Sequence, residues 1–391
     1  MKPVNSVLSS FGTTIFEVMS TLAREHGSLN LGQGFPDEDG PAHLKSVAGN
    51  AMSDKPNQYP PMPGVPELRQ AVAAHNKRFY NLDVNWENQV LITSGATEAL
   101  AASMLALIEP GDEVIVMEPV YDSYVPMIMR AGGIPKPVRL LPPEWELSED
   151  VLRAAFSGKT KLLLLNTPHN PAGKVYTDQE LGMIAALAVE HDCYVVCDEV
   201  YEHIVFDGHT HNPIMKYPGM AERTLRIGSA GKTFSMTGWK VGYVTAPPAL
   251  YAALAKAHQF LTFTTPPMLQ YAVAEGLHSD DDYFESLRLS MQQKRDRLST
   301  GLAKARFGVL PSQGTYFLTT DIRPTGFTGT DVEFCQQITV GAGVTALPMS
   351  AFYLPGAVNG QAAPDNFVRF CFCKRDEMLD EASQKLIEYF T

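Results

Sequence analysis

A regular alternation of short apolar segments with amphipathic segments, from about residue 88 onwards, is the strongest constraint on how this chain folds. The apolar segments occupy 89–93, 113–117, 161–166, 193–200, 224–229 and 241–246. Between them, apolar residues recur at helical spacing, as in 96–108 and 178–191. Continuously apolar strands that alternate with helices are typical of a mostly parallel sheet covered on both faces. The pattern therefore predicts a large α/β domain.

The pattern changes near residue 285, where a second structural unit is expected. A long charged helix is predicted over 285–305, and short strands follow at 315–320 and 366–373. The last segment, 376–390, has its apolar residues on one helical face, which suits packing against a sheet. We expect an N-terminal arm with part of the small domain at 1–40, a large domain at 41–284 and a small α+β domain at 285–391.

Charge and hydropathy narrow the range of partners. The 391 residues contain 31 Lys and Arg against 43 Asp and Glu, a formal net charge of −12. This acidic balance argues against non-specific binding to nucleic acid or to an anionic membrane. No apolar run approaches the ~20 residues that a spanning helix needs, and residues 1–27 lack the apolar core of a secretory signal. We therefore expect a cytoplasmic protein that binds neither nucleic acid nor membrane.

The cysteines and histidines give little support for a metal site. The five cysteines form no CxxC pair, and four of them lie in apolar runs, which indicates buried thiols. His209 and His211 have the spacing of a metal pair on a strand, but no acidic or cysteine cluster accompanies them. We expect no bound metal.

One segment, GSAGKTFSMTGWKVGY at 228–243, could carry covalent chemistry. Lys232 follows a predicted strand after a turn of small residues, and Lys240 comes eight residues later. A partly desolvated lysine loses its proton and attacks carbonyl groups, so Lys232 is a candidate Schiff-base nucleophile. Taken alone, the segment is more typical of an exposed lysine in a surface loop.

Three other segments place polar groups at strand or helix ends. LNTPHNPAGKVY (165–176) puts Asn166 and Asn170 just past a strand, and CYVVCDEVYEH (193–203) puts Asp198 at the end of an apolar strand. A buried carboxylate at such a position needs a cation. SGATEAL (94–100) offers open backbone N–H groups at a predicted helix start, which suits a phosphate.

Together these motifs resemble the pyridoxal-phosphate-dependent aminotransferases of fold type I, class I/II. The similarity extends from FGTTIFEVMSTLA through NLGQGFPD and QYPPMPG to NFVRFCF, and GSAGKTFSMTGWKVGY, NTPHNP and DEVYEH are most similar to the group of methionine aminotransferases and kynurenine–oxoglutarate aminotransferases. The resemblance implies a large domain with a mostly parallel seven-stranded sheet between helices, a smaller α+β domain, and pyridoxal 5′-phosphate as the cofactor.

The resemblance also implies the residues around the cofactor ring. Lys232 is similar to the lysine that forms the Schiff base and moves the substrate Cα proton. Asp198 matches the carboxylate that pairs with the pyridine nitrogen, which makes the ring an electron sink. Asn170 and Tyr201 match the donors to the phenolic oxygen, and Tyr121 matches the aromatic residue that stacks on the ring.

The phosphate of the cofactor has its own implied set of residues, namely Gly95, Ala96, Thr97, Ser229 and Lys240. Many family members have arginine where Lys240 stands, and lysine keeps the charge but loses the forked contact. Tyr59 matches a tyrosine that reaches the phosphate of the neighbouring subunit. The resemblance therefore implies a homodimer whose active sites are shared.

For the substrate, the resemblance implies contacts from Gly34, Phe16, Asn170 and Arg369. Arg369 is similar to the arginine that binds the α-carboxylate, a planar group that suits its fork. The sequence offers no identifiable second arginine for a distal carboxylate. Together with Phe16, Ile15 and Phe35, this favours a neutral apolar, sulfur-containing or aromatic amino acid, with methionine favoured and kynurenine, phenylalanine and tyrosine as further candidates.

The implied activity is a ping-pong transfer of an amino group to a 2-oxo acid through the Lys232 Schiff base. The nearest alternative on the same scaffold is a cysteine-S-conjugate β-lyase, in which a leaving group at Cβ is eliminated. A non-catalytic cofactor-binding regulator would need an added DNA-binding domain and a basic surface. Without a cofactor, Lys232 could serve a Schiff-base aldolase or dehydratase.

Overall fold

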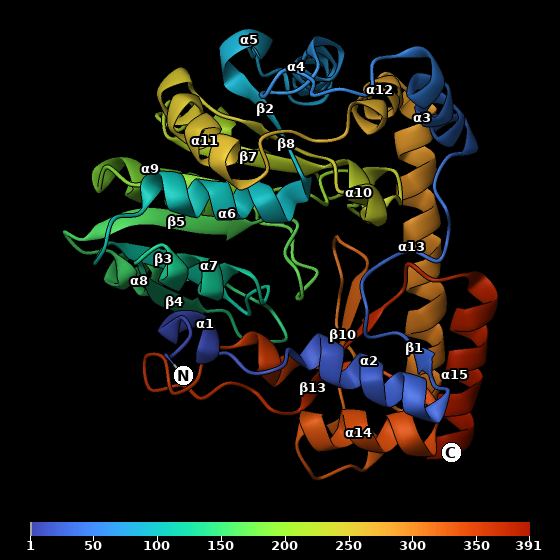
Figure 1. Ribbon diagram of the computed structural model, residues 1–391. Helices are drawn as coiled ribbons and strands as arrows, with labels where there is room; N and C mark the ends of the chain where they lie inside the picture. Colours follow the sequence, from blue (N-terminus) through green and yellow to red (C-terminus); the bar gives the residue numbers. More distant parts are fainter. Residues whose placement is uncertain (1) are drawn as a thin grey trace.

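The computed structural model, described for residues 2–391, is built around a seven-stranded sheet in the order β2-β8-β7-β6-β5-β3-β4 (Figure 1). Its strands are β2 (Val90–Thr93), β3 (Glu113–Glu118), β4 (Ile134–Arg139), β5 (Thr160–Asn166), β6 (Tyr194–Asp198), β7 (Thr224–Ser229) and β8 (Gly242–Thr245). Neighbouring strands are parallel except at β8, which is antiparallel to both β2 and β7. The predicted mostly parallel, seven-stranded sheet is confirmed.

Strand β4 is the one member of this sheet that the sequence pattern did not predict. Its sequence, IPKPVR, contains two prolines, and only its last two residues, Val138 and Arg139, are buried. It lies at the edge of the sheet and pairs only with β3. Proline is tolerated there because an edge strand leaves one row of N–H groups without a ladder partner.

Helices cover both faces of the sheet. In β3, Val114 and Val116 pack in one core with residues of α6 (Gly95–Leu107) and α11 (Pro248–Leu261). Ile115 and Met117 pack on the opposite face, in a core shared with α9 (Asp178–Glu190). Side chains alternate between the faces of a strand, so strands buried on both faces must be apolar throughout.

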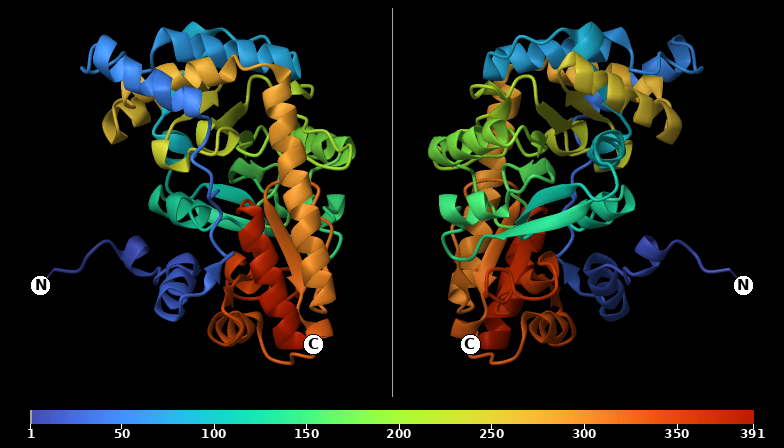
Figure 2. Two further views of the ribbon diagram at one scale, coloured as in Figure 1. Left: turned by 90° about the vertical axis from the view of Figure 1, so that its right-hand side faces the viewer. Right: turned by 90° about the vertical axis from the view of Figure 1, so that its left-hand side faces the viewer.

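A second, four-stranded antiparallel sheet is formed by the C-terminal part of the chain, in the order β12-β13-β10-β9. Its strands are β9 (Gly308–Val309), β10 (Phe317–Asp321), β12 (Leu347–Pro348) and β13 (Phe367–Cys371). Helices α13 (Asp281–Lys304), α14 (Asp331–Gly341) and α15 (Asp376–Phe390) accompany it, and Figure 2 shows α13 running along the side of the molecule beside α15.

The N-terminal segment joins this smaller unit. Helix α2 (Ile15–His26) packs against α14, and β1 (Leu29–Asn30) pairs in parallel with β11 (Val344–Thr345). Figure 2 shows residues 2–14 reaching outward from the smaller unit, and α1 (Ser6–Ser9) within this segment contacts α7 (Tyr124–Arg130). The contacts of α2 and β1 place residues 15–30 beside the smaller sheet. The division of the chain at residues 40 and 284 stays a prediction.

The remaining elements connect and flank the two sheets. They are α1 (Ser6–Ser9), α3 (Ala42–Asp54), α4 (Pro66–Tyr80), α5 (Trp86–Gln89), α7 (Tyr124–Arg130), α8 (Glu149–Ala155), α10 (Ala230–Thr233), α12 (Pro267–Leu277) and the 3₁₀ turns η1 (Ile214–Lys216), η2 (Thr237–Trp239), η3 (Arg323–Thr325) and η4 (Met349–Phe352). None of the helices within residues 2–391 has the length and hydrophobicity needed to cross a bilayer.

Candidate active site

A cavity of about 430 Å³ lies where several strands of the larger sheet end. Asn166, Asp198 and Ser229 line it, and they are the last residues of β5, β6 and β7. The carboxyl ends of parallel strands form the edge at which open α/β sheets bind ligands. Arg369 of β13 also lines the cavity, so both sheets contribute to it.

The cavity brings together every residue predicted from the sequence except one. The predicted residues that line it are Phe16, Gly34, Gly95, Ala96, Thr97, Tyr121, Asn170, Asp198, Tyr201, Ser229, Lys232, Lys240 and Arg369. Tyr59 does not line it; its side chain is 81% exposed and packs edge-on against Phe263. The prediction for Tyr59 concerns the site of a partner subunit and stays a prediction.

Lys232 lies in α10, the single helical turn that follows β7. Its Nζ donates a hydrogen bond to the hydroxyl oxygen of Tyr316, 2.8 Å away. Burial lowers the pKa of the Lys232 amine, because an apolar environment disfavours its charged form. A lower pKa favours the neutral amine, which is the form that attacks a carbonyl group or accepts a proton.

The carboxylate of Asp198 is buried at the end of β6. Its Oδ2 accepts a hydrogen bond of 2.7 Å from the hydroxyl of Tyr124, and its Oδ1 accepts one of 3.3 Å from the backbone N–H of Val200. No lysine, arginine or histidine within residues 2–391 forms an ion pair with it, and burial raises its pKa. A buried carboxylate without a cation is costly, so this residue suits a ligand that presents a positively charged N–H.

Arg369 is fully buried in β13. Its Nη1 donates to Oδ1 of Asn170 at 2.9 Å, and its Nη2 donates to the carbonyl oxygen of Gly32 at 2.7 Å. Its plane lies over the ring of Phe317, with 3.8 Å between Cζ and the ring centroid. Within the described chain its Nε has no acceptor, and burial lowers its pKa to about 10. A guanidinium with N–H groups to spare suits a carboxylate ligand.

A third charged position lies at the N-terminus of α6. Gly95 has a left-handed backbone with φ +77°. A Cβ at Gly242 would lie 2.7 Å from the Ala96 nitrogen, so the backbone segments around Gly95 and Gly242 approach closely. Lys240 reaches this turn, with its Nζ 3.5 Å from Oγ1 of Thr97, and it forms no ion pair in the described part of the chain. Exposed N–H groups at a helix start beside a cation form an anion site, which fits the phosphate of pyridoxal phosphate.

Several residues of the site were not predicted from the sequence. Tyr124 bonds to Asp198, and it follows Tyr121 in the same EPVYDSY segment, which was a usable signal. Tyr316 bonds to Lys232, but an aromatic residue at the start of an apolar strand gives no sign of that contact. Asn166 is different, because the sequence indicated a polar group at that strand end; it is the last residue of β5 and donates its Nδ2 to the backbone oxygen of Asp198 at 2.9 Å.

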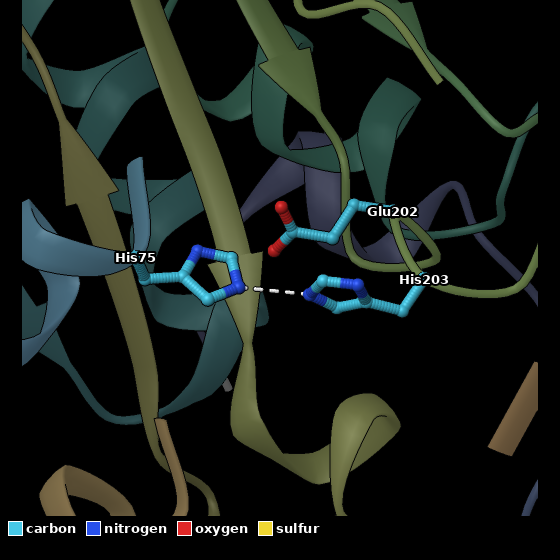
Figure 3. A group of neighbouring side chains, drawn as sticks. All are labelled: His75, Glu202 and His203. Carbon is cyan, nitrogen blue, oxygen red and sulfur yellow. Dashed lines mark hydrogen bonds between the residues drawn. The ribbon is translucent and has the colours of Figure 1, made fainter. Parts of the chain in front are cut away.

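A second group of ligand-type side chains lies outside the cavity. His75, Glu202 and His203 place their ligand atoms within 4.8 Å of one another (Figure 3). The imidazoles are hydrogen-bonded through Nε2 atoms 2.8 Å apart, and burial lowers the pKa of His75 to about 4 and of His203 to about 3. Glu202 is already paired with the buried guanidinium of Arg226. A metal ion here would lie beside a cation, so we interpret the group as a buried charge network.

The other histidines and cysteines also have structural surroundings. His211 lies 2.7 Å from a carboxylate oxygen of Glu199, whereas His209 is exposed, so the two do not act as a pair. All five cysteines are buried and free, and burial was predicted from apolar surroundings for four of them, Cys335 being the exception. Cys371 and Cys373 are neighbours, with 3.2 Å between their sulfur atoms.

Comparison with known proteins agrees with this geometry. Residues 27–386 match the family model described as aminotransferase class I and II. A probable N-succinyldiaminopimelate aminotransferase of Mycobacterium tuberculosis is 46% identical over 388 residues, which cover 97% of each chain. The solved structure of that organism's N-succinyldiaminopimelate aminotransferase superposes with a TM-score of 0.95 at 45% identity, and the match covers 99% of this chain and all 100% of the other.

Two further relatives fall in the group that the sequence motifs indicated. The methionine aminotransferase of Escherichia coli is 40% identical over 97% of each chain. A kynurenine–oxoglutarate transaminase of Dictyostelium discoideum is 38% identical over 97% of this chain and 95% of the relative. The resemblance to this group is confirmed, while the similarity to an N-succinyldiaminopimelate enzyme was not expected from the sequence.

Proposed function

Because this chain belongs to the class I and II aminotransferases, whose cofactor is pyridoxal phosphate, we propose that it transfers the amino group of a neutral apolar, sulfur-containing or aromatic amino acid to a 2-oxo acid. Methionine is the favoured donor, and kynurenine, phenylalanine and tyrosine are further candidates. The observation that carries this choice is the charge of the cavity beyond the α-carboxylate position.

The cations that line the cavity are Lys232, Lys240 and Arg369. In the proposed arrangement each has one task, namely Schiff-base chemistry, the cofactor phosphate and the substrate α-carboxylate. A second carboxylate on the substrate would therefore find no cation among the lining residues. It would instead meet the half-buried carboxylate of Asp122. Burial raises the pKa of Asp122, and the charge of Arg369 offsets only part of that rise. Two carboxylates at short range repel each other.

Apolar side chains line the same cavity. Phe16, Phe35, Tyr121 and Val200 are among them, and Phe16 packs edge-on against Phe352 with 5.7 Å between ring centroids. Such a lining favours a thioether or aromatic side chain, because apolar surface is removed from water on binding.

When bound, pyridoxal phosphate supplies an electron sink for the pair of electrons left at Cα. The proposed task of Asp198 is to keep a proton on the ring nitrogen. Because Arg369 can only donate, it fixes the oxygen of the Asn170 amide toward itself, which leaves the Asn170 NH₂ group to donate to the phenolic oxygen, together with Tyr201. Arg369 binds the carboxylate of the substrate and so orients the substrate. The neutral Lys232 amine accepts the proton from Cα and later gives it back.

The test is a panel of amino donors assayed with one 2-oxo acid acceptor. We expect methionine and the aromatic donors to give kcat/KM values at least tenfold above those of aspartate and glutamate, and Lys232→Ala to abolish turnover with all of them. Preference for aspartate would refute the argument from the cavity charges.

N-succinyldiaminopimelate is the second candidate donor, because the enzyme named for it is 46% identical to this chain. This compound carries further carboxylates beside the one that Arg369 would bind, so it needs cations that the cavity of a single chain does not supply. If it proves to be the preferred donor in the same panel, the extra cations must come from a partner subunit. A cysteine S-conjugate completes the panel, since release of pyruvate without an acceptor would identify β-lyase activity.

We also propose a cytoplasmic homodimer with shared active sites. Tyr59, Phe260 and Phe263 are exposed apolar side chains of the single chain, and a partner would cover them. Mixing Lys232→Ala with Tyr59→Ala subunits tests the sharing, because a hybrid dimer contains one site with both native residues. Activity above that of either parent is expected, and its absence in verified hybrids would exclude a role for Tyr59 across the interface.

A further inference from the structure

Tyr316 connects three parts of the chain at the back of the candidate active site. It directly precedes β10 of the smaller sheet, and its hydroxyl oxygen lies 2.8 Å from Nζ of Lys232 and 2.7 Å from the backbone oxygen of Gly34. The side chain is fully buried. One hydroxyl group thus joins the N-terminal segment, the smaller sheet and the predicted catalytic lysine.

The chemistry of the partners fixes the direction of both hydrogen bonds. A backbone carbonyl can only accept, so the single proton of Tyr316 is donated to Gly34. Toward Lys232 the phenolic oxygen can then only accept, so one N–H of the lysine amine points at it. A neutral amine has one lone pair, and this arrangement keeps that lone pair directed away from Tyr316.

The surroundings hold Tyr316 in this position. Its ring packs edge-on against Tyr201, with 5.0 Å between centroids, and against Phe317 at 4.8 Å. A Cβ at Gly34 would lie 2.5 Å from the ring of Phe317, so only glycine lets the acceptor carbonyl come this close. Burial raises the pKa of Tyr316, because the phenolate would lose its hydration; the hydroxyl therefore stays a donor to Gly34 at working pH.

We propose that Tyr316 is a positioning residue that holds the free amine of Lys232 with its lone pair available for the substrate Cα proton. The proposal rests on the proposed function in assigning that proton transfer to Lys232. Tyr316 itself transfers no proton, because its only one is committed to Gly34.

The experiment compares Tyr316→Phe with Tyr353→Phe. Tyr353 is a matched control, because its buried hydroxyl also donates to a backbone carbonyl, that of Leu140 at 3.0 Å, and it does not line the cavity. In the holoenzyme we expect Tyr316→Phe to lower kcat with methionine about three- to tenfold, the loss of one hydrogen bond, and to leave KM within about twofold. The kinetic isotope effect with α-deuterated methionine is expected to rise, since Cα–H cleavage becomes slower. Tyr353→Phe should change neither kcat nor the isotope effect.

A second readout does not depend on the amino donor. Apoprotein is mixed with pyridoxal phosphate at a series of pH values, and the growth of visible absorbance reports the reactivity of the Lys232 amine. A hydrogen bond to an oxygen that only accepts stabilises the charged amine more than the neutral one. Tyr316→Phe should therefore move the midpoint of this profile about half a pH unit to one unit lower, with no shift in Tyr353→Phe.

The outcomes separate the two proposals. An unchanged or higher midpoint in Tyr316→Phe overturns the positioning role, as does a fall in kcat matched by Tyr353→Phe. If wild-type enzyme uses none of the donors in the panel, the proposed function fails, and the midpoint comparison still decides the role of Tyr316.

Discussion

Replacing Arg369 with glutamine removes the group proposed to bind the substrate carboxylate while keeping one amide donor for Asn170 or Gly32. Of the five guanidinium N–H groups, one on Nη1 and one on Nη2 are used within the protein, and Nε has no acceptor among residues 2–391. Three N–H groups are therefore left, enough for both oxygens of a carboxylate. Two hydrogen bonds between charged groups contribute about 3–6 kcal/mol. The expected loss of kcat/KM with methionine in Arg369→Gln is about 10²- to 10⁴-fold.

The assay pairs the substitution with a change in the substrate. Methionine and 3-(methylthio)propylamine, which lacks the carboxylate, are each tested with wild-type enzyme and Arg369→Gln. The amine should be a poor substrate for both, with rates that differ less than about threefold, because the interaction removed by the substitution is already missing. Arg69→Gln is the matched control, since Arg69 is also buried and donates to the backbone oxygens of Val90 and Glu87 rather than to a carboxylate.

Two results would refute the assignment of Arg369. One is a loss with methionine smaller than about fivefold. The other is an equal loss with methionine and with the amine, which would mean that the substitution disturbs the site without removing a carboxylate contact.

Three further predictions concern the other charges. Asp198→Asn should lower kcat at least a hundredfold, because a neutral amide cannot hold a charged ring nitrogen as an ion pair does. Tyr124→Phe removes only the hydrogen bond to Asp198 and should lower kcat about tenfold. Both kcat values are measured at saturating cofactor. Lys240→Gln should retain the cofactor about tenfold or more weakly during dialysis, whereas Lys240→Arg should retain it like the wild type. Equal retention by the wild type and both variants would refute the assignment of Lys240 to the phosphate. Arg226→Met should destabilise the fold by about 3–5 kcal/mol, because it leaves the buried carboxylates of Glu199 and Glu202 without their cation. Urea unfolding measures this loss, and Arg297→Met, at an exposed ion pair, should leave the urea midpoint almost unchanged.

The large sheet could be predicted from the sequence because a strand that is buried on both faces is apolar at almost every position. Strands such as β5 and β6 are apolar at almost every position, and helical spacing separates them. Strand β4 has no such continuous apolar run, since it lies at the edge of the sheet and contains Pro135 and Pro137. The short strands of the smaller sheet were predicted only in part, because β9 and β12 have two residues each and depend on their partners for their conformation.

The site was predictable where a residue follows a motif and hidden where its role depends on a distant contact. Asp198 ends one apolar strand and Lys232 lies in the turn that follows another, and the sequences of both segments resemble those of a known family. The contact between Tyr316 and Lys232 joins residues 84 positions apart, and nothing in the segment around Tyr316 indicates which group its hydroxyl meets. Only the packing of the smaller sheet against the larger one brings the two side chains together.

The charges of the site explain how a chain with a net charge of −12 can bind anionic ligands. Arg369, Lys240 and Asp198 have no counter-ion within the described chain. Arg369 and Asp198 are also buried, and burying an unpaired charge costs stability. Pyridoxal phosphate and an amino acid present the complementary groups, namely a phosphate, a protonated ring nitrogen and a carboxylate. Binding should therefore relieve a cost that the fold bears alone, and a ligand that binds only the native state stabilises it by mass action. It follows that the gain in melting temperature on adding the cofactor should shrink in Asp198→Asn and in Lys240→Gln, each of which removes one of these charges.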